Sequence, residues 1–520
     1  MGSQAIAVPG AGAGASIPAP MDNSSAYGGG EDKSVDVGDP WLQQVVVFDW
    51  QPAEILAQNA ESMQLIVATF WCVLLARVAA QQLCPRSSPT LCYAVEFLLI
   101  VPPVVLLVTV ASDYCTHILL LMLVCSLWFL FRSQALQRAR ARSQFDLGGT
   151  RPTVLTLVRA LTHLITAVCI LAIDFGSFHR PYRKSRTFGA KLMDTGIGLF
   201  VVTMGLVSHR TRHTKDLRRS TVYAALPLLL LGLARTVALL IVGYGQDEHE
   251  YGRDLNAFFT LGLTKLFGSL ASLVARRDVH LLPLGVGLLA AHQMSLSVFG
   301  LSDYVMDEDV PRATLFSANR EGLVSLPGFV AMYLLSIYLR RWLMAATLLS
   351  YSDMVRKLRR LLLLVLILWC LFGASAFAVG ISRVTCNFGY VVWTLSIICT
   401  IMWMALFGVD FVIDSVLARD PHALAVDSQE KGQLLEPAGA EGEGNVSRNG
   451  NAIGSFAICQ SLNLNGLTFF LLANLLTGGV NIFLKPEDRS QAESVLILLV
   501  YMFLATKAVH ELLKRGVRLA

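Results

Sequence analysis

Long apolar runs, separated by short polar segments, dominate the chain. About thirteen of these runs are near the roughly 20 residues that a helix needs to cross a bilayer. They begin at about residues 63, 91, 114, 154, 190, 219, 255, 280, 324, 359, 389, 455 and 492. Backbone in lipid must satisfy its own hydrogen bonds, which a helix does within one segment. The pattern therefore predicts an all-α, polytopic integral membrane protein with about thirteen transmembrane helices.

Two longer polar segments divide this pattern. Residues 1–55 are rich in Gly, Ala, Pro and Ser without periodicity, which predicts a disordered tail. Residues 416–454 combine several glutamates with glycines, which predicts a flexible linker. Between and after these segments we expect an eleven-helix catalytic membrane body at 56–415 and a two-helix C-terminal membrane segment at 455–520.

Composition supports the membrane class and narrows the chemistry. Hydrophobic residues make up 54% of the chain and charged residues 15%, with a mean hydropathy of +0.56. The ten cysteines are scattered without a Cys-x-x-Cys pair, so neither a disulfide framework nor a metal site is expected. Phosphate-loop and serine-hydrolase motifs are not found. We expect the lipid bilayer, and no nucleic acid, as a partner.

The basic residues of the short loops predict the orientation, because Lys and Arg are retained on the cytosolic side. Placing 209–215 and 356–360 in the cytosol puts the acidic loops 246–250 and 302–309 outside. The N-terminus is then lumenal, with the tail on that side, and the C-terminus and the 416–454 linker are cytosolic. Residues 175–191 break the rule, since they hold five basic side chains on the outer side. A loop that keeps such charges is predicted to bind a ligand.

Ionisable residues within or beside the apolar runs are candidate site residues. Facing lipid, each would cost about 2.5–3.5 kcal/mol at the centre of the bilayer, so they should face one another or a wet cavity. One interpretation is an interhelical ion-pair network without chemistry, which stays open for Lys265. For Asp174 with Lys184 we favour chemistry, because a carboxylate beside a cation suits general-base activation of a hydroxyl.

Four short motifs, in the same order over about residues 150–485, resemble the inositol acyltransferases of GPI-anchor biosynthesis. The first combines Leu171-Ala-Ile-Asp-Phe175, Phe178, Arg180, Lys184 and Gly189 with Met193-Asp-x-Gly-x-Gly198. The others are Glu250-Tyr-Gly252 with Asn256-x-Phe-Phe-Thr260 and Lys265, then Asn319-Arg-Glu-Gly322, then Phe469-Phe-Leu-Leu-x-Asn474-x-x-Thr477-Gly478-x-x-Asn481.

This resemblance implies a multi-pass enzyme of the endoplasmic reticulum membrane. Such enzymes move a fatty acyl group, typically palmitoyl, from acyl-CoA to the inositol 2-hydroxyl of glucosaminyl-phosphatidylinositol, with no cofactor. It implies Asp174 as general base and Lys184 as an orienting or oxyanion-stabilising cation. Arg320 is expected to bind the lipid phosphate and Glu321 the glucosamine ammonium, although a loop-to-helix cap is the alternative there. The predicted substrate-binding residues are Arg180, Asp194, Arg235, Asn256, Lys265, Asn319, Arg320, Glu321 and Asn474.

The chain departs from the family pattern at Gly176, His179, Pro181 and Arg186, which leaves the acyl-chain preference open. Two other classes compete. An O-acyltransferase of another type would use a buried histidine, for which His292 is the candidate, but we interpret His292 as a packing or hydrogen-bonded residue. A secondary transporter would also place charges in the membrane, and helices broken at the midplane would favour it.

Overall fold

The structure, a computed structural model, describes residues 50–83, 89–148, 152–242, 248–417 and 456–518. The predicted disordered tail and flexible linker lie almost entirely outside these residues. At their edges the helices run further than predicted, because α1 begins at Pro52 and α18 ends at Leu417.

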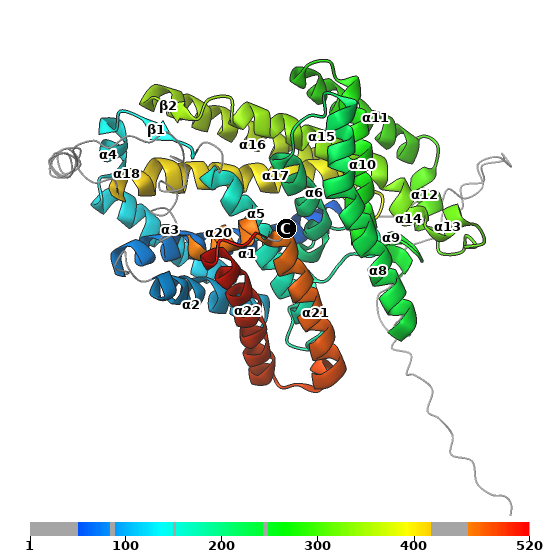
Figure 1. The fold of residues 1–520 in the computed structure, drawn as a ribbon, viewed down its shortest axis with the longest axis horizontal. Helices are drawn as coiled ribbons and strands as arrows, with labels where there is room; N and C mark the ends of the chain where they lie inside the picture. The colour runs from blue at the N-terminus through cyan, green and yellow to red at the C-terminus, as the bar shows by residue number, and fades with distance from the viewer. Residues whose placement is uncertain (1–49, 84–88, 149–151, 243–247, 418–455, 519–520) are drawn as a thin grey trace, which may run out of the picture. The chain divides into compact units, whose positions relative to one another are not determined.

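Helices account for nearly all of the described secondary structure (Figure 1). The first half contains α1 (Pro52–Leu83), α2 (Pro89–Val108), η1 (Ser112–Tyr114), α3 (Cys115–Arg132), α4 (Ala135–Ala141), α5 (Thr153–Ala172), η2 (Arg180–Tyr182), η3 (Leu192–Asp194), α6 (Thr195–Val207), α7 (Thr214–Ser220), the π-helical η4 (Thr221–Ala225), α8 (Leu226–Val242) and α9 (Glu248–Tyr251).

The second half contains α10 (Ala257–Val274), η5 (Asp278–His280), α11 (Leu281–Ser297), α12 (Leu301–Met306), α13 (Leu315–Ala318), α14 (Arg320–Val324), α15 (Leu326–Leu343), α16 (Tyr351–Ala378), α17 (Phe388–Ala405), the π-helical η6 (Leu406–Ile413), α18 (Asp414–Leu417), α20 (Ala457–Leu464), α21 (Gly466–Leu484), η8 (Pro486–Asp488) and α22 (Gln491–Lys514). Within the described ranges the strands are β1 (Phe145–Asp146) and β2 (Leu348–Leu349), which pair antiparallel.

The predicted all-α membrane architecture is confirmed. Twelve helical segments among the described residues are long and apolar enough to cross a membrane. The shorter apolar helix Leu192–Val207 corresponds to the fifth predicted run, so each of the thirteen runs has its helix.

Helix α5 is the centre of the core and carries Asp174 just beyond its end. In its span 83% of the residues are buried, against 6% in the span that contains α3. Sixteen of its twenty residues are buried, including the polar Thr156, Thr162 and His163, as in a helix that other helices surround inside a bundle. Helices α6, α17, α20 and α21 pack against it.

The C-terminal pair is packed onto this core. Helices α21 and α22 lie side by side (orange and red in Figure 1), α20 and α21 contact α5, and α22 contacts α2. Gly466 permits the close approach of α21 to α5, because a Cβ there would lie 2.5 Å from Nε2 of His163. The packing brings the far end of α21 to the residues that follow α5.

Candidate active site

Asp174 lies in the turn that follows α5, and two aromatic residues of this turn, Phe175 and Phe178, are buried. Its Oδ2 accepts a hydrogen bond of 2.9 Å from Nδ2 of Asn481 on α21. Burial raises the pKa of Asp174, although this hydrogen bond and the positive charge of Lys184 lower it in part. Asn481 Oδ1 is buried and has no hydrogen-bond partner among the described residues. The carboxylate of Asp174 therefore has a raised pKa and lies next to the amide of Asn481, whose oxygen is free to accept a hydrogen bond.

Lys184 lies in the loop after η2 and forms an ion pair with Glu250 of α9. Its side chain is 35% exposed, so the ammonium can reach a ligand. Burial would raise the pKa of Glu250, but the charges of Lys184 and Arg383 outweigh burial and hold that pKa below its usual range. Glu250 is therefore ionised and orients Lys184, whose effect on Asp174 is electrostatic rather than a direct contact.

Asp194 anchors the loop that carries Lys184. It is fully buried, and its carboxylate accepts hydrogen bonds from Ser185 Oγ at 2.7 Å, from Ser185 N at 3.2 Å and from Arg383 Nε at 3.2 Å. These contacts fix the residue next to Lys184. We call Lys184, Ser185, Asp194, Glu250 and Arg383 the loop cluster.

Sequence reasoning missed Arg383, the charged residue of the 379–387 loop. Its guanidinium is buried, pairs with Asp194 and lies 5.8 Å from the ring centre of Tyr251. The available signal was its position, because a basic residue on a predicted lumenal loop is a second exception to the distribution of charge.

The side chains of Asn256 and Asn319 form hydrogen bonds within the fold, mostly to backbone groups. Asn256 caps α10 by accepting from Phe258 N at 3.0 Å, and it donates to Gly232 O at 2.9 Å. Asn319 accepts from Asp254 N at 2.8 Å and donates to its Oδ2 at 2.9 Å. Both side chains join segments distant in the sequence.

Arg320 and Glu321 are buried in an internal network, with exposed fractions of 1% and 2%. Arg320 donates to Val310 O at 3.0 Å and to Asp307 O, while Glu321 binds Arg312 through both oxygens at 2.6 and 3.1 Å. The structure thus places these side chains where they hold the 307–312 segment. This arrangement favours the structural alternative over direct contact with a lipid headgroup.

The other predicted binding residues are spread over several elements. Arg180 is exposed in η2, in the loop that carries Lys184, and Arg235 is exposed on α8. Asn474 is partly buried and donates to Phe470 O of its own helix at 2.7 Å. His292 donates from Nε2 to Thr385 O at 2.9 Å, which agrees with its interpretation as a hydrogen-bonded packing residue.

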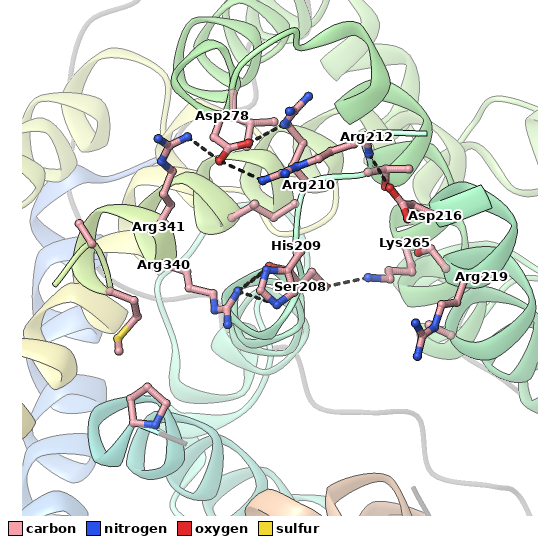
Figure 2. A pocket seen from close by; sticks show the side chains of 18 of the residues that line it. Ser208, His209, Arg210, Arg212, Asp216, Arg219, Lys265, Asp278, Arg340 and Arg341 are labelled. Carbon is pink, nitrogen blue, oxygen red and sulfur yellow. Dashed lines mark hydrogen bonds and ion pairs between the residues drawn. The ribbon is translucent and has the colours of Figure 1, made fainter. Parts of the chain in front are cut away.

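Lys265 belongs to a different place, a cavity of 1050 Å³ at the far ends of α6 and α15 (Figure 2). Its ammonium donates to Ser208 Oγ at 2.7 Å and to the hydroxyl of Tyr333 at 2.9 Å. Six basic side chains line the cavity against two carboxylates, and we call it the basic cavity. The basic residues are Arg210, Arg212, Arg219, Lys265, Arg340 and Arg341, and the acidic ones are Asp216 and Asp278.

Internal pairing neutralises only part of this charge. Asp278 binds Arg210 at 2.6 Å and Arg341 at 2.5 Å, as Figure 2 shows. Arg340 donates to the ring of His209 at 2.9 Å. Burial and the charge of Arg340 lower the pKa of His209, which fits a neutral ring that accepts this hydrogen bond. An excess of positive charge therefore faces the cavity, a condition that suits phosphate groups.

Comparison with known proteins gives a consistent result over most of the chain. The profile of the GWT1 family matches residues 54–512. An uncharacterized protein of Arabidopsis thaliana is 32% identical over 433 residues, covering 82% of this chain and 88% of its own length. GPI-anchored wall transfer protein 1 of Schizosaccharomyces pombe is 30% identical, covering 70% and 72%. Phosphatidylinositol-glycan biosynthesis class W protein of Dictyostelium discoideum is 28% identical, covering 69% and 73%. The chain is thus a member of the GWT1 family.

Proposed function

We propose that this protein is an acyl-CoA-dependent inositol acyltransferase of GPI-anchor biosynthesis in the endoplasmic reticulum membrane. It transfers a fatty acyl group, palmitoyl in our proposal, to the inositol 2-hydroxyl of glucosaminyl-phosphatidylinositol. Family membership and the names of the Schizosaccharomyces and Dictyostelium relatives support the pathway. The observation that carries the chemistry is the partly buried Asp174, held by Asn481 at the edge of a membrane body beside the loop of Lys184.

In this proposal Asp174 takes the proton of the inositol hydroxyl. Its raised pKa makes the ionised carboxylate a stronger base than that of an ordinary aspartate. The hydroxyl oxygen attacks the thioester carbonyl carbon, and the ammonium of Lys184 stabilises the oxyanion. The carbon–sulfur bond then breaks, and the proton held by Asp174 returns to the CoA thiolate.

The basic cavity fits the nucleotide end of the donor. CoA carries a diphosphate and a 3′-phosphate, and the cavity offers six basic side chains against two carboxylates. Arg219 and Arg340 are the arginines best placed for this role, because neither forms an ion pair with a carboxylate among the described residues. Guanidinium groups bind phosphate by paired hydrogen bonds.

For the acceptor, we assign phosphate binding to Arg180 rather than to Arg320. Arg180 is exposed in the loop of Lys184, whereas Arg320 donates to backbone carbonyls within the fold. An exposed guanidinium can bind a phosphodiester without first breaking internal hydrogen bonds.

The test is rescue of cells that lack inositol acylation, followed by mass analysis of their GPI intermediates. Wild-type protein should restore acylated glucosaminyl-phosphatidylinositol, and Lys184→Met should not. Arg183→Met is the matched control, since Arg183 is the exposed neighbour of Lys184 and should preserve rescue. Accumulation of non-acylated intermediate with wild-type protein present at normal levels would refute the proposal.

A further inference from the structure

An apolar groove of 620 Å³ lies outside both the loop cluster and the basic cavity, between α11, α15, α16 and α17. Leu282 and Val286 of α11 and Leu363 and Ile367 of α16 line it and are exposed. These helices are candidate membrane spans, so the groove opens in the part of the surface that faces hydrocarbon.

One end of the groove is rich in hydrogen-bond donors. Arg360, Trp342 and Tyr338 line it there, and within the described ranges none of the three side chains has a hydrogen-bond or salt-bridge partner. Arg360 is exposed and ends the basic run that starts at Arg356, immediately before the apolar part of α16. The groove therefore has the polarity of an amphiphile, with donors at one end and hydrocarbon along the rest.

Its length corresponds to one leaflet. The residues of α16 that line the groove extend from Arg360 to Leu371, 11 positions along the helix. This corresponds to about 16 Å at 1.5 Å per residue. The hydrocarbon core of a bilayer is about 30 Å thick. An acyl chain whose headgroup lies at Arg360 would thus reach to about the midplane.

We propose that the groove binds one acyl chain of an anionic glycerophospholipid, with its headgroup phosphate on Arg360. Charge selects the class of lipid, because Arg360 lines the headgroup end as an exposed cation that forms no ion pair within the described ranges. Trp342 and Tyr338 complete the headgroup end with donors typical of the membrane interface. The site does not depend on the proposed enzymatic function.

The lipid would support the wall of the basic cavity. The groove is lined by Leu335, Tyr338, Leu339 and Trp342 of α15, while Ile337, Arg340 and Arg341 of the same helix line the basic cavity. The two sets alternate at helical spacing and so lie on different faces of α15. A lipid in the groove therefore packs behind the helix that presents Arg340.

The test uses quenching of Trp342 fluorescence by phospholipids brominated in their acyl chains, with the full chain in nanodiscs. The Trp342→Phe variant isolates the contribution of Trp342. We expect brominated phosphatidylserine to quench Trp342 at a several-fold lower mole fraction than brominated phosphatidylcholine. Arg360→Gln should abolish this preference, and Arg359→Gln, the neighbour that does not line the groove, should keep it.

A second variant distinguishes a lipid bound in the groove from contact with the surrounding bilayer lipids. Ala290 is exposed in the groove, so Ala290→Phe should fill it without disturbing the core and should reduce the amount of phosphatidylserine that copurifies, measured by mass analysis. Equal quenching by both lipids would overturn the proposal. The absence of quenching would also overturn it, and would indicate that a protein covers the groove. Relief of quenching by palmitoyl-CoA would also overturn it, by assigning the groove to the donor chain.

Discussion

The loop cluster and the basic cavity, at opposite ends of α6, balance their charges differently. In the loop cluster, Lys184 pairs with Glu250 and Arg383 pairs with Asp194. In the basic cavity, six basic side chains face two carboxylates. Paired charges fix the geometry of the chain, whereas an excess of positive charge favours the binding of anions. Beside the paired groups stands Asp174, whose hydrogen-bond partner among the described residues is the neutral amide of Asn481.

The largest effect is expected from Asp174→Asn, which keeps the shape of the side chain and removes its basicity. Acyl transfer in microsomes at equal expression should fall about 100-fold to 10,000-fold, the range of general-base catalysis. Asp113→Asn, an exposed carboxylate of η1, is the control and should retain activity. Activity of Asp174→Asn within about threefold of wild type would exclude Asp174 as the base.

The excess charge of the basic cavity is tested by Arg219→Gln and Arg340→Gln. Each should raise KM for acyl-CoA by about tenfold to a hundredfold, because a hydrogen bond to a charged group is worth about 1.5–3 kcal/mol. KM for the acceptor lipid should stay nearly constant. Arg218→Gln changes the neighbouring exposed arginine, which does not line the cavity, and serves as control. If acceptor KM rises and donor KM does not, the cavity binds the other substrate.

A smaller effect is expected from Asn481→Leu, read as a change in pH dependence. The amide of Asn481 stabilises the ionised carboxylate, so its removal should raise the pKa of Asp174 further. A base must be deprotonated, and the acidic limb of the pH–rate profile should therefore move to higher pH. Arg219→Gln should leave that limb in place. An unchanged acidic limb in Asn481→Leu would show that another group titrates.

The smallest kinetic effect is expected from Arg320→Lys. The two terminal nitrogens of the Arg320 guanidinium donate to Val310 O and Asp307 O, and the single ammonium of lysine cannot reproduce this geometry. The thermal stability of the protein in detergent should therefore fall. In the protein that remains folded, acceptor KM should change by less than about threefold, since Arg320 is buried. A large rise in acceptor KM with unchanged stability would show instead that Arg320 binds the phosphate of the acceptor lipid.

The helices were predictable because length and apolarity decide whether a segment crosses a membrane. The pattern located all thirteen runs, including Leu192–Val207, which is too short to qualify by length alone. Charge and motif likewise selected Asp174 and Lys184 as candidates. The role of Asn319 was harder to predict, because an amide can bind backbone or ligand equally well and only packing decides between them.

The pairings within the site were not predictable. Lys184 was expected beside Asp174, but the fold brings Glu250 to it from 66 positions away. The basic cavity collects arginines from α7, α15 and the segment after α6, each of which alone is an ordinary basic loop signal. Such contacts depend on which helices pack together, and this packing cannot be inferred from the local sequence.

Because Asn481 contacts Asp174, the site is complete only after the C-terminal helices have been synthesised. During synthesis Asp174 and Lys184 enter the membrane about 300 residues before α21 is made, and at 5–20 residues per second this interval lasts at least about 15 seconds. Over that interval the nascent chain has a base without the amide that stabilises its ionised form. A premature stop codon between Lys184 and Asn481 would therefore leave a protein that retains both predicted catalytic residues yet lacks a completed site.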